Sequence, residues 1–442
     1  MKKNLLGTLG VLSLTGALLA PSVAMAQAQT EVQFWHAFTG RLGELVAEQV
    51  ADFNASQNDY VVVASHKGNY TETLNAGIAA FRADEQPHIL MVFEVGTATM
   101  MTAGGAVKPV YEVMAESGAS FDPDAYIGAV KGYYTTTEGE MLSLPFNSST
   151  PVLWVNRDAM SAAGVDPDTD LSTWEQVDVV LEQLKAGGAS CPLVTAWQSW
   201  IHLENLSAYH DVPFASKSNG FAGLDTELMI NGEAQLAHLS KMGEWARDGK
   251  FIYTGRRNEG GANFRSGECV LFTESSAGYA GISDEAEFDF EVRPLPYWKA
   301  LVDSPQNTII GGASLWVMSG HEDDEYKGVA EFLSFLSTSD VQAAWHQNTG
   351  YLPITAEAGE ATRASGFYDE NPGTDIALIQ MTSKKPTANS KGLRLGFFDQ
   401  IRGVIDEELE AIWAGDKSAK EAMDSAKTRG DALLRRFETA NR

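Results

Sequence analysis

The side chains best placed for binding chemistry lie in the segment 145–156. Residues 147–150 are Asn-Ser-Ser-Thr, and an apolar run over residues 152–155 follows at once. Amides and hydroxyls can each donate and accept hydrogen bonds, so a cluster of them at the start of a buried strand can hold a small polar ligand. The segment then passes into a helix start. This layout indicates a ligand cleft rather than a catalytic elbow.

Other kinds of chemistry find less support. The eight histidines include no pair at i, i+4 spacing, and there is no Cys/His cluster, so the pattern predicts no transition-metal site. No nucleophile elbow, Walker A motif or dinucleotide-binding glycine pattern occurs. We expect no enzymatic activity and no metal or cofactor. An exported hydrolase or lyase is the alternative, with Glu94 as the candidate acid, although Glu94 lacks a recognisable partner carboxylate.

The elements that must position these groups follow from the hydrophobic pattern. Residues 32–34 alternate in polarity, apolar residues between 42 and 53 recur at helical spacing, and residues 60–64 form a β-branched run. A helix over 74–81 and a strand over 88–93 come next. Strand, helix and strand of this length form a right-handed parallel crossover, so the pattern predicts a doubly wound α/β lobe.

Four residues follow the ends of the predicted strands. Trp35 and His36 come after the first strand, Tyr70 after the second, and Glu94 directly after the third. Ligands bind beyond the carboxyl ends of parallel strands, so we expect these four residues on one edge of the sheet. Each of the first three has a structural alternative: Trp35 can belong to the core, His36 can cap a turn, and Tyr70 can begin a helix.

The second half of the chain shows similar patterns. A helix is predicted over 173–185, and a strand over 269–272 runs into a turn rich in serine and glycine at 274–278. A helix that starts after a strand offers free backbone N–H groups, which can hold an anion. Trp197 and Trp200 are three residues apart and can share one face, where they either stack on a ligand or pack in the core.

The length of the chain requires more than one core. Single cores stop growing at about 250–300 residues, and the sequence has 442. Crossings between lobes are predicted at 146–156, 309–317 and 350–353. We expect a first lobe of residues 27–147 and 312–352 and a second lobe of residues 148–311 and 353–442. Each is predicted to be a mainly parallel sheet flanked by helices, with the ligand cleft between the lobes.

The first 26 residues have the pattern of a cleavable secretory signal. Lys2 and Lys3 precede an apolar run, and we expect cleavage after Ala26. A membrane anchor is the alternative, but the run is short for a bilayer. The mature chain is expected to be soluble in a periplasm, where Cys191 and Cys269 can form one disulfide. Its formal charge of −27 becomes −29 without the two lysines, which excludes a nucleic-acid partner.

A resemblance to a known family rests on six stretches: residues 67–70, 94–101, 145–153, 309–318, 350–355 and 392–396. They are similar to the sn-glycerol 3-phosphate-binding periplasmic proteins of ABC importers, a branch of the maltose-binding-like extracellular solute-binding family. The similarity runs from about residue 34 to residue 437. It implies the type II-like two-lobed binding-protein fold. By matching position, it also implies ligand contacts at Tyr70, Glu94, Ser149, Ser275, Gly312, Tyr351 and Arg402.

The implied ligand suggests a role for several of these residues. The planar fork of Arg402 suits phosphate oxygens, and the alternative is a surface ion pair with Asp406 or Glu407. Glu94 repels phosphate, so it is expected to accept hydrogen bonds from glycerol hydroxyls. The two tryptophans would stack on the glycerol chain or hold choline by a cation–π contact.

The resemblance implies a binding protein whose lobes close on sn-glycerol 3-phosphate or on a glycerophosphodiester such as glycerophosphocholine. The closed form would deliver the ligand to a membrane permease driven by a cytoplasmic ATPase, and we expect the protein to be a monomer. One alternative is the same scaffold tuned to a neutral sugar, in which Arg402 is structural. Another is an exported phosphodiester hydrolase, which would turn over glycerophosphodiesters.

Overall fold

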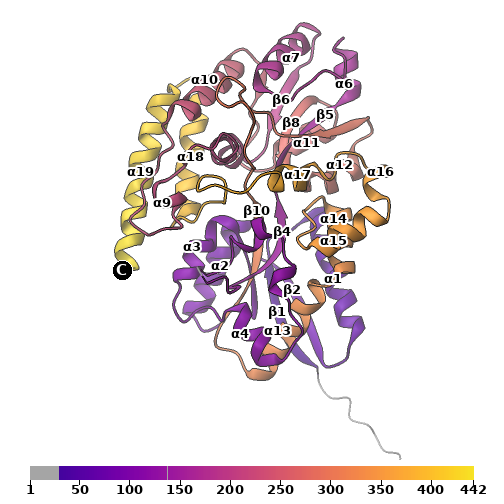
Figure 1. Cartoon of the computed structure of the whole chain (residues 1–442), viewed down its shortest axis with the longest axis vertical. Helices are drawn as coiled ribbons and strands as arrows, with labels where there is room; N and C mark the ends of the chain where they lie inside the picture. Colours follow the sequence, from indigo (N-terminus) through magenta and orange to yellow (C-terminus); the bar gives the residue numbers. More distant parts are fainter. Residues whose placement is uncertain (1–28, 137) are drawn as a thin grey trace, which may run out of the picture.

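The computed structural model describes residues 29–136 and 138–442, which form two α/β lobes placed end to end (Figure 1). We call the lobe built on the sheet β2-β1-β3-β10-β4 the first lobe, and the lobe built on the sheet β7-β6-β8-β5-β9 the second lobe. The predicted signal segment and its cleavage site lie outside the described residues. In each sheet one strand runs antiparallel to the others, so the predicted two-lobed fold with mainly parallel sheets is confirmed.

The first sheet forms where the alternation of the sequence predicted it. Its strands are β1 (Thr30–His36), β2 (Tyr60–His66), β3 (Ile89–Phe93), β10 (Gly311–Val317) and β4 (Leu144–Ser149). β1 pairs in parallel with β2 and β3, and β10 lies antiparallel between β3 and β4. Val32, Phe34 and Val62 are buried because alternate side chains of a strand share one face. All of β3 is buried, as expected of a strand covered on both faces.

In the second sheet, as in the first, the fourth strand of the order runs antiparallel to the other four. Its strands are β7 (Phe251–Ile252), β6 (Cys191–Thr195), β8 (Cys269–Ser275), β5 (Pro151–Asn156) and β9 (Phe290–Arg293). Cys191 lies opposite Cys269 in the parallel pairing of β6 with β8, with their Cα atoms 4.5 Å apart, and the two form a disulfide. The disulfide that the sequence made possible is therefore present, and it links neighbouring strands in the core of the second lobe.

Helices flank both sheets. In the first half of the chain they are α1 (Gly40–Ser56), α2 (Tyr70–Arg82), α3 (Thr97–Thr102), α4 (Val110–Ser117), α5 (Gly128–Lys131), α6 (Arg157–Ala162), α7 (Trp174–Ala186), α8 (Leu206–Tyr209) and α9 (Ser216–Asn219). In the second half they are α10 (Glu233–Arg247), α11 (Gly260–Arg265), α12 (Tyr279–Glu285), α13 (Asp323–Leu336), α14 (Ser339–Thr349), α15 (Ala356–Ala364), α16 (Phe367–Glu370), α17 (Ile376–Thr382), α18 (Phe398–Trp413) and α19 (Ala419–Ala440). α18 and α19 pack against each other along the second lobe (yellow in Figure 1). In the described part of the chain, no helix is both long enough and apolar enough to cross a membrane.

Local capping explains where two predicted helices begin. Asn69 and Glu72 form a reciprocal capping box at the start of α2, and Thr173 and Gln176 do the same for α7. Each box satisfies two backbone N–H groups that lack a partner inside the helix. The cap at Asn69 makes Tyr70 the first residue of α2, so the prediction that Tyr70 begins a helix is confirmed.

The predicted crossing segments lie side by side. β4 ends at Ser149 and β5 begins at Pro151, so Thr150 alone joins the two sheets there. The Thr150 hydroxyl donates to the carbonyl oxygen of Ile309, just before β10, at 3.1 Å. In the third segment, the N–H of Leu352 donates to the carbonyl oxygen of Ser148 at 2.7 Å. Hydrogen bonds therefore tie the three segments together between the lobes.

Candidate functional site

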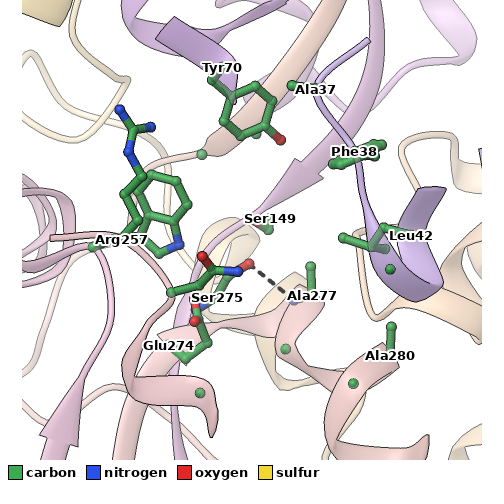
Figure 2. Close-up of a pocket in the computed structure, with 18 of the residues that line it drawn as sticks. Ala37, Phe38, Leu42, Tyr70, Ser149, Arg257, Glu274, Ser275, Ala277 and Ala280 are labelled. Carbon is green, nitrogen blue, oxygen red and sulfur yellow. Dashed lines mark hydrogen bonds between the residues drawn. The ribbon is translucent and has the colours of Figure 1, made fainter. Parts of the chain in front are cut away.

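A cavity of ≈ 590 Å³ lies between the lobes, beyond the ends of β3, β4 and β8. Its walls include every residue predicted to bind ligand: Tyr70, Glu94, Ser149, Trp197, Trp200, Ser275, Gly312, Tyr351 and Arg402. In Figure 2, Tyr70 of the first lobe lies on the opposite side of the cavity from Glu274 and Ser275 of the second lobe. A cleft of this volume between lobes is typical of a small-molecule site.

Two tyrosines, the partly buried Tyr70 and the buried Tyr351, form part of the first wall. The ring of Tyr70 stacks on Phe93 with centroids 5.4 Å apart, and its hydroxyl accepts a hydrogen bond from Asn147 Nδ2 at 3.0 Å. Tyr351 stacks on Trp345 at 5.9 Å. Burial raises the pKa of Tyr70 well above its ordinary value and raises the pKa of Tyr351 to about 12. Both phenols therefore remain protonated at neutral pH and can donate hydrogen bonds.

Gly312 shapes the wall at the junction of the lobes. Its φ is +101°, a backbone conformation that glycine adopts without steric cost, and a Cβ there would lie 1.7 Å from the carbonyl oxygen of Asn147. In the pairing of β10 with β4, Gly311 lies opposite Ser149 and Gly312 opposite Ser148. Since Gly311, Gly312 and Ser149 all line the cavity, backbone and hydroxyl groups form this part of the wall.

Glu274 and Ser275 end β8 in the second wall. Ser275 Oγ accepts a hydrogen bond from the N–H of Ala277 at 3.1 Å (Figure 2), and its own proton can still be donated. Glu274 is buried, and burial raises the pKa of its carboxyl to about 8. This carboxyl is therefore mostly protonated at neutral pH and provides a further donor. Glu274 was not predicted from the sequence, although its place at the end of β8 resembles that of Glu94 after β3.

The two tryptophans differ in their surroundings. Trp200 is buried, its ring packs against Gly311, and its Nε1–H donates to the carbonyl oxygen of Ile310 at 3.3 Å. Trp200 therefore both packs in the core and lines the cavity. Trp197 is only partly buried and has a φ of +44°, and its ring lies 6.4 Å from that of Tyr70. Trp197 is therefore the more accessible ring for a ligand.

Arg402 lies in a buried ion triad. Its Nη2 is 2.7 Å from Glu94 Oε1 and 2.7 Å from Glu204 Oε2, while its Nε is 2.9 Å from Glu204 Oε1. Burial by itself would lower the pKa of Arg402, but Glu204 and Glu94 raise it overall, so the guanidinium stays charged. Two carboxylates already compensate this cation. From the sequence, Arg402 was expected to bind phosphate and Glu94 to bind glycerol hydroxyls, each on its own. In the structure the two side chains form an ion pair with each other.

The predicted alternative for Arg402, a surface ion pair with Asp406 or Glu407, is wrong. Glu407 extends from α18 to Arg429, at 2.5 Å. Asp406 is buried, and burial raises its pKa to about 7. Sequence proximity suggested these partners because both lie within five positions of Arg402 on one helix. The fold instead brings Glu204 to Arg402 from a segment about 200 residues earlier.

Arg257 is a second cavity residue that the sequence analysis missed. It lies between β7 and α11, and its guanidinium lies over the ring of Trp197 at 5.7 Å. Its Nη2 donates to Thr71 Oγ1 at 3.2 Å, and Thr71 belongs to α2 of the first lobe. The contact therefore spans the cleft (Figure 2 shows Arg257 beside the cavity). No motif marks this arginine in the sequence.

Trp35 and His36 lie at the carboxyl end of β1, on the same edge of the sheet as Tyr70 and Glu94, as expected, but they do not line the cavity. They are the last residues of β1 rather than residues that follow it. Lys67 Nζ lies 4.0 Å from the centre of the Trp35 ring. His36 Nδ1 accepts a hydrogen bond from the N–H of Phe38 at 3.3 Å, which confirms the alternative that His36 caps a turn.

His88, His321 and Glu325 bring three potential metal ligands within 4.8 Å of one another, with His88 far in sequence from the neighbouring pair His321 and Glu325. The N–H of Gln33 donates to His88 Nδ1 at 2.9 Å, so the proton of the neutral ring lies on Nε2, which is 3.4 Å from Glu325. A metal at Nε2 would have to displace this proton. The two rings stack with centroids 3.9 Å apart. This geometry favours a hydrogen-bonded stack rather than a metal centre.

Comparison with known proteins identifies clear relatives. A family model described as bacterial extracellular solute-binding protein matches residues 48–374. The sn-glycerol-3-phosphate-binding periplasmic protein UgpB of Yersinia enterocolitica serotype O:8 is 48% identical over 431 residues, which cover 97% of this chain and 98% of the relative. UgpB of Escherichia coli O6:K15:H31 is also 48% identical, with the same coverage of both chains.

Solved structures show the same fold at low sequence identity. The crystal structure of UgpB from Mycobacterium tuberculosis in complex with glycerophosphocholine has a TM-score of 0.77 and 20% identity, and the match covers 92% of this chain and 99% of that one. Maltose-bound MalE3 of T. maritima has a TM-score of 0.74 and 16% identity, with 91% and 100% of the two chains covered.

Proposed function

The chain belongs to the bacterial extracellular solute-binding protein family, and we propose that it is the periplasmic substrate-binding subunit of an ABC importer. Its ligand is sn-glycerol 3-phosphate or a glycerophosphodiester such as glycerophosphocholine. Relatives that are 48% identical over nearly the whole chain carry the first ligand in their name, and a fold neighbour was crystallised with glycerophosphocholine. Both ligands combine a small polyol with a phosphate group.

One observation carries the proposal. The seven positions that the resemblance assigned to ligand contact, together with Trp197 and Trp200, line a single cavity between the lobes. These positions come from segments scattered between residues 70 and 402. Random placement would leave some of them elsewhere on the molecule. Their meeting in one cavity supports the assignment of the cavity as the ligand site.

The chemistry of the walls suits a polyol phosphate. Tyr70, Tyr351, Ser149 and Ser275 offer neutral donors, which can satisfy a buried anion without many cations. In this proposal a carboxylate oxygen of Glu94 accepts from a glycerol hydroxyl, and Arg402 holds Glu94 in place. Micromolar binding corresponds to about −8 kcal/mol, a value that several such hydrogen bonds can supply after the cost of ordering.

We further propose that the lobes move as units about the crossing segments. The proposed boundaries are residues 27–147 and 312–352 for the first lobe and residues 148–311 and 353–442 for the second, with Ser148, Ser149 and Gly311 at the crossings completing strands of the first sheet. Thr150 alone joins β4 to β5, which makes this junction a suitable hinge. A ligand that contacts both lobes would stabilise the closed form, because it shifts the equilibrium only through its difference in affinity for the two forms.

The proposed partners follow from the family. The closed protein would deliver its ligand to membrane permease subunits coupled to a cytoplasmic ATPase, acting as a monomer in the periplasm. The relatives are solute-binding proteins, and the proposal assigns no catalytic residue. The strongly acidic chain, with a formal charge of −27, supports the absence of a nucleic-acid partner.

Calorimetry on the mature, ligand-stripped protein tests the proposal. We expect saturable binding of sn-glycerol 3-phosphate and glycerophosphocholine and no binding of maltose. Binding of maltose alone would instead support a neutral-sugar protein. Appearance of free choline during incubation with glycerophosphocholine would support the hydrolase alternative. Tryptophan fluorescence gives an independent readout, because Trp197 and Trp200 line the cavity.

A further inference from the structure

The arginines that line the cavity differ in one respect. Three of them hold carboxylates: Arg41 binds Glu44 and Glu48, Arg265 binds Glu285, and Arg402 binds Glu94 and Glu204. The fourth is Arg257. Among the described residues, no carboxylate lies within ion-pair distance of its guanidinium. Arg257 thus brings a positive charge to the cavity that its neighbours do not compensate.

The hydrogen bonds of Arg257 leave most of its donors available. A guanidinium carries five N–H donors, and the bond from Nη2 to Thr71 Oγ1 uses one of them. Glu259 accepts from the backbone N–H of Arg257 at 2.7 Å, not from its side chain. The neighbouring Arg256, by contrast, is held by Glu410 at 2.6 Å and 2.8 Å.

The position of Arg257 restricts how it can move. Its guanidinium lies over the ring of Trp197 at 5.7 Å, and Thr71 on α2 holds it from the opposite lobe. An arginine ordered by an aromatic face and one neutral hydrogen bond can bind a phosphate with little loss of side-chain entropy. The same two contacts place its free donors at the boundary between the lobes.

We infer that Arg257 is the residue that makes the cleft selective for ligands that carry a phosphate group, because it binds that group across the cleft. Arg402 then acts as a positioning residue, since Glu94 and Glu204 already compensate its charge and it orients Glu94. This inference rests on the proposed function. It assigns the phosphate to a residue other than the arginine that the sequence resemblance had nominated.

Arg257→Gln tests the inference, with Arg256→Gln as the matched control. Arg256 is the neighbouring arginine, but it does not line the cavity and already pairs with Glu410 at 2.6 Å. By calorimetry we expect Arg257→Gln to weaken binding of sn-glycerol 3-phosphate and of glycerophosphocholine by at least about tenfold, as for the loss of a hydrogen bond to a charged group. Arg256→Gln should change either affinity by less than about twofold. Arg257→Lys, which keeps the charge without the fork, should fall between wild type and Arg257→Gln.

The salt dependence of ligand affinity gives a second readout, which would not change if Arg257 had only a structural role. The affinity of the wild type for sn-glycerol 3-phosphate should fall as salt is raised, and the affinity of Arg257→Gln should fall less steeply. Unchanged melting temperatures would show that the variants remain folded. If the wild type binds these ligands and Arg257→Gln binds them equally well, or if both variants lose affinity alike, the inference is wrong and the proposed function stands. If the wild type binds neither ligand, both are wrong.

Discussion

Arg402 Nη2 lies 2.7 Å from Glu94 Oε1 and thereby joins α18 of the second lobe to the end of β3 in the first. The same guanidinium binds Glu204 of the second lobe, and the side chains of Arg402, Glu94 and Glu204 are 9%, 8% and 1% exposed. Motion that separates the lobes must break the contact to Glu94 while Arg402 keeps Glu204. The triad is therefore a link between the lobes as well as part of the cavity wall.

Arg402→Met should destabilise the protein strongly. Removing the arginine leaves Glu94 and Glu204 buried without a cation, and such a loss costs about 3–5 kcal/mol. Urea denaturation followed by circular dichroism measures the change. Lys420→Gln is the control, because Lys420 forms an exposed pair with Asp424 and its loss should cost no more than about 1 kcal/mol. Equal stability of the two variants would contradict a buried triad.

Glu274→Gln should alter the pH dependence of stability. The pKa of Glu274 is raised from its ordinary 4.5 to about 8 by burial, so the folded state favours the protonated form. Protonated Glu274 therefore contributes its full stabilisation of the folded state below pH 4.5. As pH rises from 4.5 to about 8 the free energy of unfolding falls, by at most about 1.4 kcal/mol per pH unit. The neutral amide of the variant avoids that loss.

Melting temperatures measured from pH 5 to pH 9 test this prediction. The variant should gain stability relative to wild type as pH rises toward about 8, and the difference should then level off. Glu287→Gln, at an exposed position of the same lobe, is the control and should follow the wild-type curve. Parallel curves for Glu274→Gln and wild type would show that the carboxyl is ionised in the folded protein at neutral pH.

Replacing Cys191 and Cys269 together by alanine should lower stability without removing ligand binding. The disulfide closes a loop with a sequence separation of 78, and losing such a cross-link costs about 2–5 kcal/mol. Both cysteines are buried in the second sheet and do not line the cavity. Denaturation of the wild type with and without reductant should reproduce the difference. If reductant leaves the wild type unchanged, the thiols are not bonded.

Gly312→Ala should disrupt the junction between the lobes. Its Cβ would lie 1.7 Å from the backbone oxygen of Asn147, so β4 or β10 must shift. We expect a loss of several kcal/mol, about 3 or more, together with weaker ligand binding. Gly403→Ala is the matched control, because a Cβ at that position in α18 meets nothing within 4 Å. Alanine there should stabilise the helix by up to about 1 kcal/mol.

The sequence by itself was sufficient to predict the two lobes, the main strands and helices of the first sheet, and the hydroxyl-rich crossing at Ser149. These features depend on the spacing of neighbouring residues, since a strand buries alternate side chains and a helix buries one face. The caps at Asn69 and Thr173 are likewise local, because each acts on a residue three positions away. The family resemblance added Ser275, Gly312, Tyr351 and Arg402, whereas Glu274 and Arg257 of the cavity were not predicted.

Only the tertiary structure decided which charges meet. Glu94, Glu204 and Arg402 come from three distant segments, and nothing in their local sequence states that they share one buried site. The raised pKa of Glu274 depends on its burial in the folded protein, and the uncompensated charge of Arg257 depends on which acids do not reach it. Local periodicity places a residue within its element, whereas the energy of a charge depends on every group packed around it.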